Sequence, residues 1–209
     1  MIRYKTAAEA AEAEQIIERS RFIAFVRPVS SKEEADAFFA EIRAMHRSAT
    51  HNVPAFVIGD KMQLQWASDD GEPQGTAGAP IVQMLVKEGI TNTAVMVTRY
   101  FGGIKLGTGG LVRAYTGSAK AALEAAGIAE VKERIIFEIR TAYSYLPKLQ
   151  KAEGDRFRIE EISYADTVRI RVSADPEQRE SVLTFLADLT AGSAEVLFEK
   201  EELAKVSVI

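Results

Sequence analysis

The sequence predicts an α+β protein of two domains, and three observations lead to this fold class. The chain has 209 residues, 47% of them hydrophobic, which is enough to bury a core and exceeds the usual size of one domain. Strand-like and helix-like segments alternate along its first part. From residue 131 the pattern restarts in the order βαββαβ, which is typical of a ferredoxin-like domain. We therefore expect domains at 1–130 and 131–209.

The elements of the first domain are expected from hydrophobic periodicity and from residues that start or stop helices. Ser31 and Glu34 form a capping box, so a helix should follow with Met45 and four earlier apolar residues inward. Gly59-Asp60 is a pair that closes hairpins. The unbroken apolar run 93–98 is typical of a central strand covered on both faces. The expected strands are 21–29, 53–58, 62–67 and 93–98, and two further helices begin at Pro80 and Leu111 and end at Gly89 and Gly127.

The second domain is expected to contain four strands and two helices. Asp175 precedes Pro176, a combination that indicates a capped helix start. The expected strands are 134–140, 156–164, 167–173 and 195–208, and the expected helices are 146–153 and 177–189.

Composition excludes several classes of protein. The chain contains no cysteine, so disulfides, a thiol nucleophile and thiolate zinc sites are excluded. It begins without the apolar segment of a signal peptide, and no run approaches the roughly 18 apolar residues of a membrane span. We expect a cytoplasmic protein that does not contact the membrane. The net charge of -4 argues against bulk binding to nucleic acid, and no DNA sequence specificity is expected.

A local cationic, glycine-rich segment lies inside this acidic protein. No Asp or Glu occurs between Glu88 and Glu124. The run GGIKLGTGG at 102–110 resembles a phosphate loop, but Thr108 stands where a Walker loop needs lysine, and no G-x-G-x-x-G fits. Backbone amides at the start of the following helix should still favour an anion. The candidate residues here are Arg99, Gly102, Gly103, Lys105, Gly107, Gly109 and Arg113.

Two sources of the anion remain open. Arg113 is expected in the first turn of a helix, where a cation is unfavourable unless an anion lies nearby. The acidic loop 68–78 is an internal candidate, and an external phosphate or carboxylate bound with Arg99 and Lys105 is the other. The same loop could hold a cation or act in acid/base chemistry, although its spacing is not that of an EF-hand and a solvated turn explains it too. Its candidate residues are Asp69, Asp70, Glu72, Gly75 and Thr76.

Catalytic candidates are weak. His51 could act as a base if Asp69 or Asp70 oriented it, although a simple hydrogen-bonded loop histidine is the favoured interpretation. His46 and His51 do not share a helical face, so a two-histidine metal site is not expected. No Gly-x-Ser-x-Gly elbow is present. We expect neither a metal nor a cofactor.

The second domain offers a candidate RNA-binding face. Pairing of the two central strands across Ala165-Asp166 should place four arginines on the open face of the sheet. Glu138 and Glu160 would share that face, and apart from Tyr164 the stacking aromatics of an RNA-recognition motif are missing. Self-compensated surface charge is the alternative. The four residues are Arg156, Arg158, Arg169 and Arg171.

Two long segments carry a family resemblance. ASDDGEPQGTAGAPI at 67–81 and VMVTRYFGGIKLGTGGLVRAY at 95–115, together with ATHN at 49–52, closely resemble the signature of the IMPACT family, in its bacterial YigZ-like branch. The resemblance implies that the first domain has the fold of the second domain of ribosomal protein S5, and that the second domain is similar to domain V of elongation factor G. Ser48 and Val53 depart from residues common in the family, Asp and Cys respectively.

The resemblance also implies a process. Eukaryotic relatives restrain the initiation-factor kinase of the amino-acid starvation response by competing for its activator, but bacteria lack that kinase. We therefore expect a binding or regulatory protein acting in translation or its stress regulation, with RNA, the ribosome or a translation-associated protein as partner. The alternative is an enzyme acting on a small phosphorylated or carboxylated metabolite, with Arg99, Lys105 and Arg113 holding the anion. An adaptor that binds another protein through the same loops is a third possibility.

Overall fold

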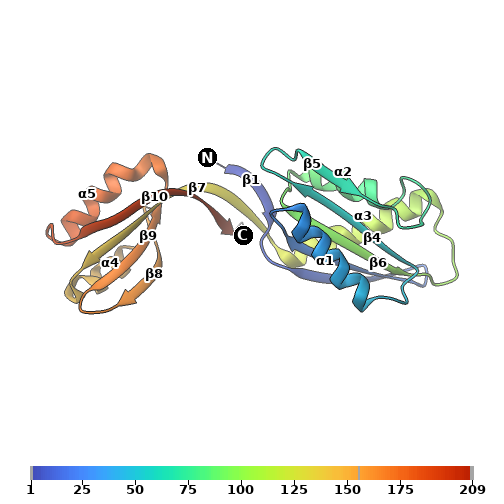
Figure 1. Ribbon diagram of the computed structural model, residues 1–209, viewed down its shortest axis with the longest axis horizontal. Coiled ribbons are helices and arrows are strands. Elements are labelled where there is room, and N and C mark those ends of the chain that lie inside the picture. The colour runs from blue at the N-terminus through green and yellow to red at the C-terminus, as the bar shows by residue number, and fades with distance from the viewer. Residues whose placement is uncertain (1, 155, 208–209) are drawn as a thin grey trace. The chain divides into compact units, whose positions relative to one another are not determined.

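The computed structural model describes residues 2–154 and 156–207, and the chain divides into two compact units. One unit comprises Ile2–Val131 together with residues from Lys205 onward, and the other comprises Lys132–Ala204. Each unit combines strands and helices, which confirms the α+β fold class (Figure 1).

The first unit is built on a five-stranded antiparallel sheet. Its strand order is β2-β3-β6-β4-β5, and β6 lies at the centre, as the apolar run 93–98 predicts. The elements of this unit are β1 (Ile2–Ala7), β2 (Ala11–Ile17), β3 (Ser20–Pro28), α1 (Lys32–Met45), β4 (His51–Ile58), β5 (Leu64–Ala67), α2 (Gly78–Glu88), β6 (Thr93–Tyr100) and α3 (Gly107–Ala126).

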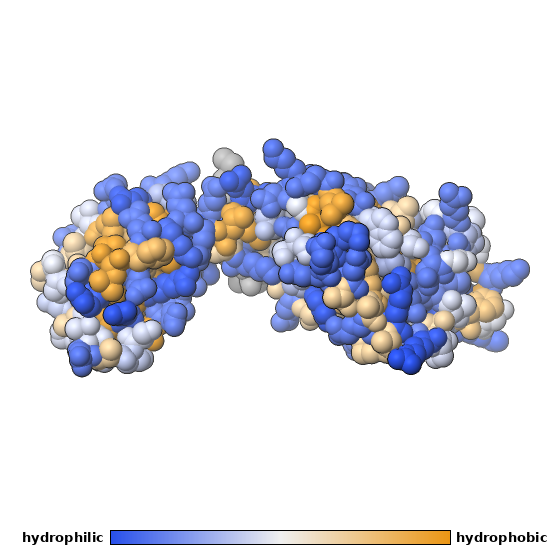
Figure 2. Space-filling model, in the orientation of Figure 1, coloured by the Kyte–Doolittle hydropathy of each residue, from blue (hydrophilic) through white to orange (hydrophobic). Residues whose placement is uncertain are grey.

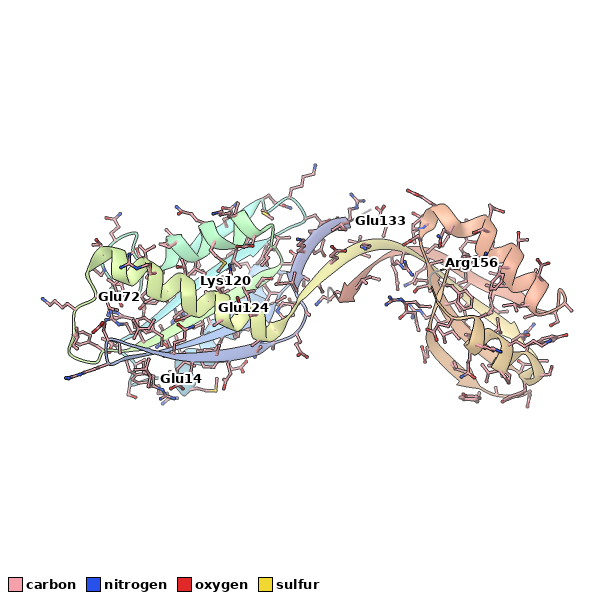
Figure 3. The ribbon with its side chains drawn as sticks, turned by 180° about the vertical axis from the view of Figure 1, so that it is seen from behind. Glu14, Glu72, Lys120, Glu124, Glu133 and Arg156 are labelled. Atoms are coloured by element: carbon pink, nitrogen blue, oxygen red, sulfur yellow. The ribbon has the colours of Figure 1, made fainter. Side chains whose placement is uncertain are left out.

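Helices cover both faces of this sheet. Helix α1 lies on one face, while α2 and α3 lie on the other, as Figures 1 and 3 show from opposite sides. Two separate cores result, one containing Phe38 and Phe39 of α1 and the other containing Tyr115 of α3. Strand β6 is buried along almost its whole length because neighbouring strands and helices surround it.

The caps predicted at Ser31 and Gly89 are confirmed, and the structure corrects two other predictions about the helices. Ser31 caps α1 by accepting a hydrogen bond from the Glu34 N–H, and Gly89 ends α2 in the left-handed region. Met45 was predicted inward, but it is the last residue of α1 and is 59% exposed. Helix α3 begins at Gly107, four residues before the predicted Leu111, so Arg113 lies in the second turn and not in the first.

Two strands were missed at the start of the chain. The polar segment that holds β1 and β2 gives no continuous apolar run, because β2 is an edge strand whose side chains alternate between partly buried and exposed. Its partner β3 has a buried apolar centre, so the pairing is recognisable only from the tertiary structure.

The second unit has the βαββαβ order expected of it. Strand β7 pairs with β9 and with β10, and β9 pairs with β8; β1 also pairs with β7, which continues from the end of α3. Asp175 does not cap a helix with its side chain but accepts a hydrogen bond from Arg134. The elements are β7 (Ile128–Thr141), a 3-10 turn (Tyr143–Tyr145), α4 (Leu146–Ala152), β8 (Arg158–Tyr164), β9 (Val168–Ala174), a 3-10 turn (Pro176–Gln178), α5 (Arg179–Leu189) and β10 (Glu195–Ser207).

The core of the second unit lies between its sheet and its helices. Phe137 and Ile139 of β7 pack with Leu149 of α4 and Leu186 of α5. Val208, the predicted last residue of the final strand, lies outside the described residues.

The visible surface is mainly hydrophilic, with separate hydrophobic patches (Figure 2). Within the described part of the chain, no helix combines the length and the apolar character that crossing a membrane requires.

Candidate functional site

Antiparallel pairing brings the predicted loops of the first unit to one end of its sheet. His51, at the start of β4, lies opposite Arg99, near the end of β6. Strand β5 runs back beside β4, so the acidic loop that follows it returns to the start of β4. The glycine-rich loop leaves the sheet after β6 at the same end. Residues near positions 50, 70 and 100 of the sequence thus become neighbours because of strand register.

A buried ionic cluster joins the acidic loop to β6. Arg99 Nη1 donates to Glu72 Oε1 at 2.6 Å, and Nη2 donates to Ser20 Oγ at 3.2 Å. The Tyr115 hydroxyl donates to the same Glu72 oxygen at 2.7 Å. The two charged side chains are only 5% and 4% exposed. Glu72 of the acidic loop is therefore the partner of Arg99, whereas the sequence indicated this loop as a candidate partner of Arg113. Figure 3 labels Glu72 at the end where α3 begins.

The surroundings of the cluster hold the Tyr115 hydroxyl in its protonated state. Burial raises the pKa of Tyr115 well above its ordinary value, and its hydrogen bond to Glu72 raises it further, so the hydroxyl stays a donor. The Arg99 guanidinium also lies 5.3 Å from the ring centroids of both Phe22 and Phe101. Its Nε is buried and has no hydrogen-bond partner among the described residues.

His51 is held between the acidic loop and Glu72. Its Nδ1 lies 2.8 Å from the Asp70 carbonyl oxygen; since that oxygen can only accept, Nδ1 carries the proton. Its Nε2 lies 3.7 Å from Glu72 Oε1. The orienting group is thus the backbone of Asp70, whose carboxylate instead accepts from the Asn52 N–H at 2.6 Å.

Asp69 organises the acidic loop from within. Its carboxylate accepts from the Gly75, Ala77 and Gly78 N–H groups at 2.7, 3.1 and 2.9 Å. Burial raises the pKa of Asp69, but these three hydrogen bonds together outweigh burial and hold the pKa below its ordinary value. The Thr76 hydroxyl likewise donates within the loop, to the Pro73 carbonyl. Asp69 therefore takes up the N–H groups that lead into α2.

The glycine-rich loop is shaped by close backbone contacts. A Cβ at Gly102 would lie 2.0 Å from the backbone of Arg19, so no other residue fits there. The Gly102 N–H donates to Ser20 Oγ at 3.1 Å. Gly103 and Gly107 have φ of 86° and 70°, in the left-handed region that favours glycine.

A cavity of about 440 Å³ opens beside this loop. One part of its wall is apolar and includes Pro73, Leu106 and Leu111. The remaining wall combines the ionic cluster with the start of α3: Thr50, His51, Glu72, Arg99, Phe101, Lys105, Gly107 and Thr108.

The start of α3 faces this cavity without a cap. No side chain of the described residues caps the helix, and its first turn contains no acidic residue. The N–H groups of the first turn have no partner within a helix, and they make its N-terminus a favourable place for an anion. Lys105, which precedes the helix, is exposed and forms no ion pair with the described residues.

The three cations predicted to hold one anion do not surround one cavity. Arg99 is paired with Glu72. Arg113 lines a second cavity of about 390 Å³, together with Glu18, Lys105 and the apolar Leu106. Gly109 lies beside Arg113, since a Cβ there would be 3.7 Å from Nη1. Arg113 lies in the second turn of α3 and is not among the residues that line the first cavity. Lys105 lines both cavities.

The arginines of the second unit are largely paired. Arg171 Nη2 donates to Glu202 at 2.9 Å, and Arg169 Nη1 lies 3.8 Å from Glu138. Arg156 was expected on the open face, but it precedes β8 and its guanidinium lies over the ring of Phe185 on α5, 4.8 Å from the centroid.

A bulge in β8 changes the register of this face. Arg158 lies opposite Ser173, yet it is Glu161 that lies opposite Arg171. Glu160 accepts a hydrogen bond from the Ser173 hydroxyl. The geometry therefore resembles the self-compensated alternative more than a continuous cationic sheet.

Comparisons with known proteins converge on one family. The family described as "Impact N-terminal domain" matches residues 18–123. "IMPACT family member YvyE" of Bacillus subtilis is 39% identical over 194 residues, covering 92% of this chain and 89% of that protein. "IMPACT family member YigZ" of Escherichia coli is 35% identical over 189 residues, covering 88% and 92%. The chain belongs to the IMPACT family.

The fold of this IMPACT family member also has a solved counterpart. A crystal structure described as that of a hypothetical protein aligns with a TM-score of 0.59 at 33% identity, covering 95% of this chain and 98% of the other. The matched domain, 18–123, contains the buried ionic cluster and every residue that lines the 440 Å³ cavity.

Several residues of this IMPACT-family site escaped sequence analysis. Tyr115 was not among the predicted site residues, and its hydroxyl is a donor to Glu72. Ser20 supports both Arg99 and the glycine-rich loop. Phe101 is the third residue that sequence analysis missed. Its position between the end of a strand and the pair Gly102-Gly103 was the sequence feature that could have indicated it. Among the described residues, no group of three or more His, Asp or Glu side chains is arranged to hold a metal ion.

Proposed function

We propose that this IMPACT family member is a cytoplasmic binding protein that acts in translation or its stress regulation by binding RNA. The observation that carries the proposal is two exposed cations without ion-pair partners among the described residues, Lys105 just before the uncapped start of α3 and Arg113 in its second turn. The surrounding segment between Glu88 and Glu124 contains no acidic residue. Phosphate groups are the anions that such a surface attracts.

The two units contribute unequally to this proposal. In the first unit Lys105 and Arg113 are available, since neither forms an ion pair with the described residues. In the second unit Arg169 and Arg171 already have carboxylate partners. RNA contact is therefore assigned to the first unit. The family resemblance to eukaryotic proteins of translational control supports the process.

The test is co-sedimentation of the protein with ribosomes and with total RNA across a salt series. The variant carries Lys105→Ala and Arg113→Ala, and the control carries Lys61→Ala and Lys87→Ala, two exposed lysines elsewhere that remove the same charge. Binding should weaken only in the first variant, and its dependence of log affinity on log salt should become shallower by about 2.

Two outcomes would overturn the proposal. One is the absence of binding by the parent protein at low salt, and the other is an equal loss in the two variants. Sedimentation with ribosomes that persists after digestion of exposed RNA would instead indicate a translation-associated protein as the partner.

A second candidate function rests on His51. This histidine lines the cavity beside a buried carboxylate, an arrangement that can transfer a proton to a small phosphorylated or carboxylated metabolite. The corresponding test is incubation with a pool of such metabolites, followed by mass spectrometry, with His51→Gln as the variant. Turnover by the parent protein that the variant loses would support the enzyme; no turnover by the parent protein contradicts it.

A further inference from the structure

We infer that the 440 Å³ cavity binds a single nucleotide, with its phosphate at the first turn of α3 and its base against Phe101. This inference deepens the proposed RNA-binding function and rests on it for the biological source of the nucleotide. Free nucleotides and unpaired nucleotides of an RNA strand share this chemistry.

The phosphate end is defined by three groups. Gly107 and Thr108 bring the uncapped first turn of α3 into the cavity wall, and Lys105 adds a cation without a carboxylate partner among the described residues. Arg99 lines the same cavity, is 96% buried by residue, and has an Nε with no partner in the described part of the chain. A buried N–H without an acceptor is costly, so this guanidinium keeps hydrogen-bonding capacity that Glu72 and Ser20 do not use.

The base end is defined by an exposed aromatic ring. Phe101 is 47% exposed although it lines the cavity, and its ring lies against the Arg99 guanidinium. An aromatic ring supported in this way can stack on an unpaired base, because every base has a flat π-face. Leu106 and Pro73 supply further apolar surface beside it.

Size and charge agree with this ligand class. A cavity of about 440 Å³ lies within the 300–1,000 Å³ range of ordinary small-ligand sites, whereas inorganic phosphate would leave most of it unfilled. The Glu72 carboxylate in the wall does not exclude a phosphate, because Arg99 pairs with its charge and Tyr115 donates to the same oxygen.

The test is calorimetric titration of the full chain with adenosine monophosphate, adenosine and inorganic phosphate. The monophosphate should bind at least about tenfold more tightly than either part alone, because only it engages both ends of the cavity. Phe101→Leu should weaken its binding by about tenfold, the loss expected when base stacking is removed. The matched control is Phe198→Leu, the same change at a phenylalanine that is 50% exposed in β10, and it should leave binding unchanged.

The charged end has its own pair of variants. Lys105→Gln should weaken the monophosphate while leaving adenosine unaffected, and Lys87→Gln should change neither. Absence of monophosphate binding, or binding that Phe101→Leu and Lys105→Gln leave unchanged, would overturn the inference. Tighter binding of a short single-stranded RNA than of the monophosphate would identify a strand as the source, and the reverse order a free nucleotide.

Failure of this inference is distinguishable from failure of the proposed function. If RNA co-sedimentation depends on Lys105 and Arg113 but the monophosphate does not bind, the function stands and the nucleotide site falls. If the monophosphate binds but RNA and ribosomes do not, the site stands as a free-nucleotide site and the function falls.

Discussion

Each unit contains an Arg–Glu pair whose arginine lies on the sheet, and the two pairs differ in their exposure to water. In the first unit Arg99 and Glu72 are 5% and 4% exposed and lie 2.6 Å apart. In the second unit Arg169 and Glu138 are 56% and 38% exposed and lie 3.8 Å apart. Water screens the second pair and leaves it little net energy, whereas the first pair must compensate for the loss of hydration of both charges.

This comparison explains why the site lies in the first unit. Two further hydrogen bonds fix the buried pair, because Ser20 accepts from Arg99 and Tyr115 donates to Glu72, so the pair holds the cavity wall in place. An exposed pair can separate at little cost and positions nothing. The buried pair therefore stabilises the site of the first unit, whereas the exposed pair of the second unit is mainly solvated by water.

The largest expected effect comes from breaking the buried pair. Arg99→Ala leaves Glu72 buried without its cation and should lower the free energy of unfolding by about 3–5 kcal/mol. Chemical denaturation followed by tryptophan fluorescence measures this in the first unit, because the only tryptophan of the chain is Trp66 in β5. Replacing both partners by leucine should recover much of the loss. A loss below about 1 kcal/mol in the single variant would contradict the buried-pair interpretation.

The next effect tests the backbone packing that carries the glycine-rich loop. Gly102→Ala places a methyl group 2.0 Å from the Arg19 backbone and should cost about 1–3 kcal/mol, as overpacking does. Gly117→Ala is the matched control, since it lies within α3 with no atom near its Cβ position and should stabilise the helix by about 0.5–1 kcal/mol. Equal stability of the two variants would argue against the close approach.

Asp69 provides a pH-dependent test of the acidic loop. Its pKa in the folded state is held below the ordinary value of an aspartate, so the unfolded state binds the proton more tightly. The resulting stabilisation is present above the unfolded pKa and is lost as the pH falls through the folded pKa. Asp69→Asn should remove about 1–2 kcal/mol at neutral pH and flatten this acid dependence. Parallel pH profiles for parent and variant would show that the three backbone hydrogen bonds do not depend on the charge.

The smallest effect is expected at the exposed pair. Arg169→Ala should change the free energy of unfolding of the second unit by about 0–1 kcal/mol, because both side chains are solvated. Circular dichroism during denaturation measures it. A loss as large as that of Arg99→Ala would remove the contrast between the two units.

Local sequence was sufficient for most of the fold. Hydrophobic runs located the central strands, and Ser31 and Gly89 marked helix ends because capping depends on residues near each other in the chain. The βαββαβ order of the second unit was likewise predictable from periodicity. Strand β2 was not, because the polar pattern of an edge strand is explained only by its partner β3.

The candidate site also has features that the sequence predicts and features that only the structure shows. Glycine spacing and an acid-free segment were enough to locate the loops, since both are properties of the chain itself. The ion-pair partner of each charged site residue was not predictable from the sequence, because strand register and helix packing decide which side chains meet. Pairing of β4 with β6 brought His51 beside Arg99, and the return of the acidic loop buried Glu72 against them. The packing of α3 placed Arg113 at another cavity. These contacts join residues far apart in the sequence, so only the packed structure determines them.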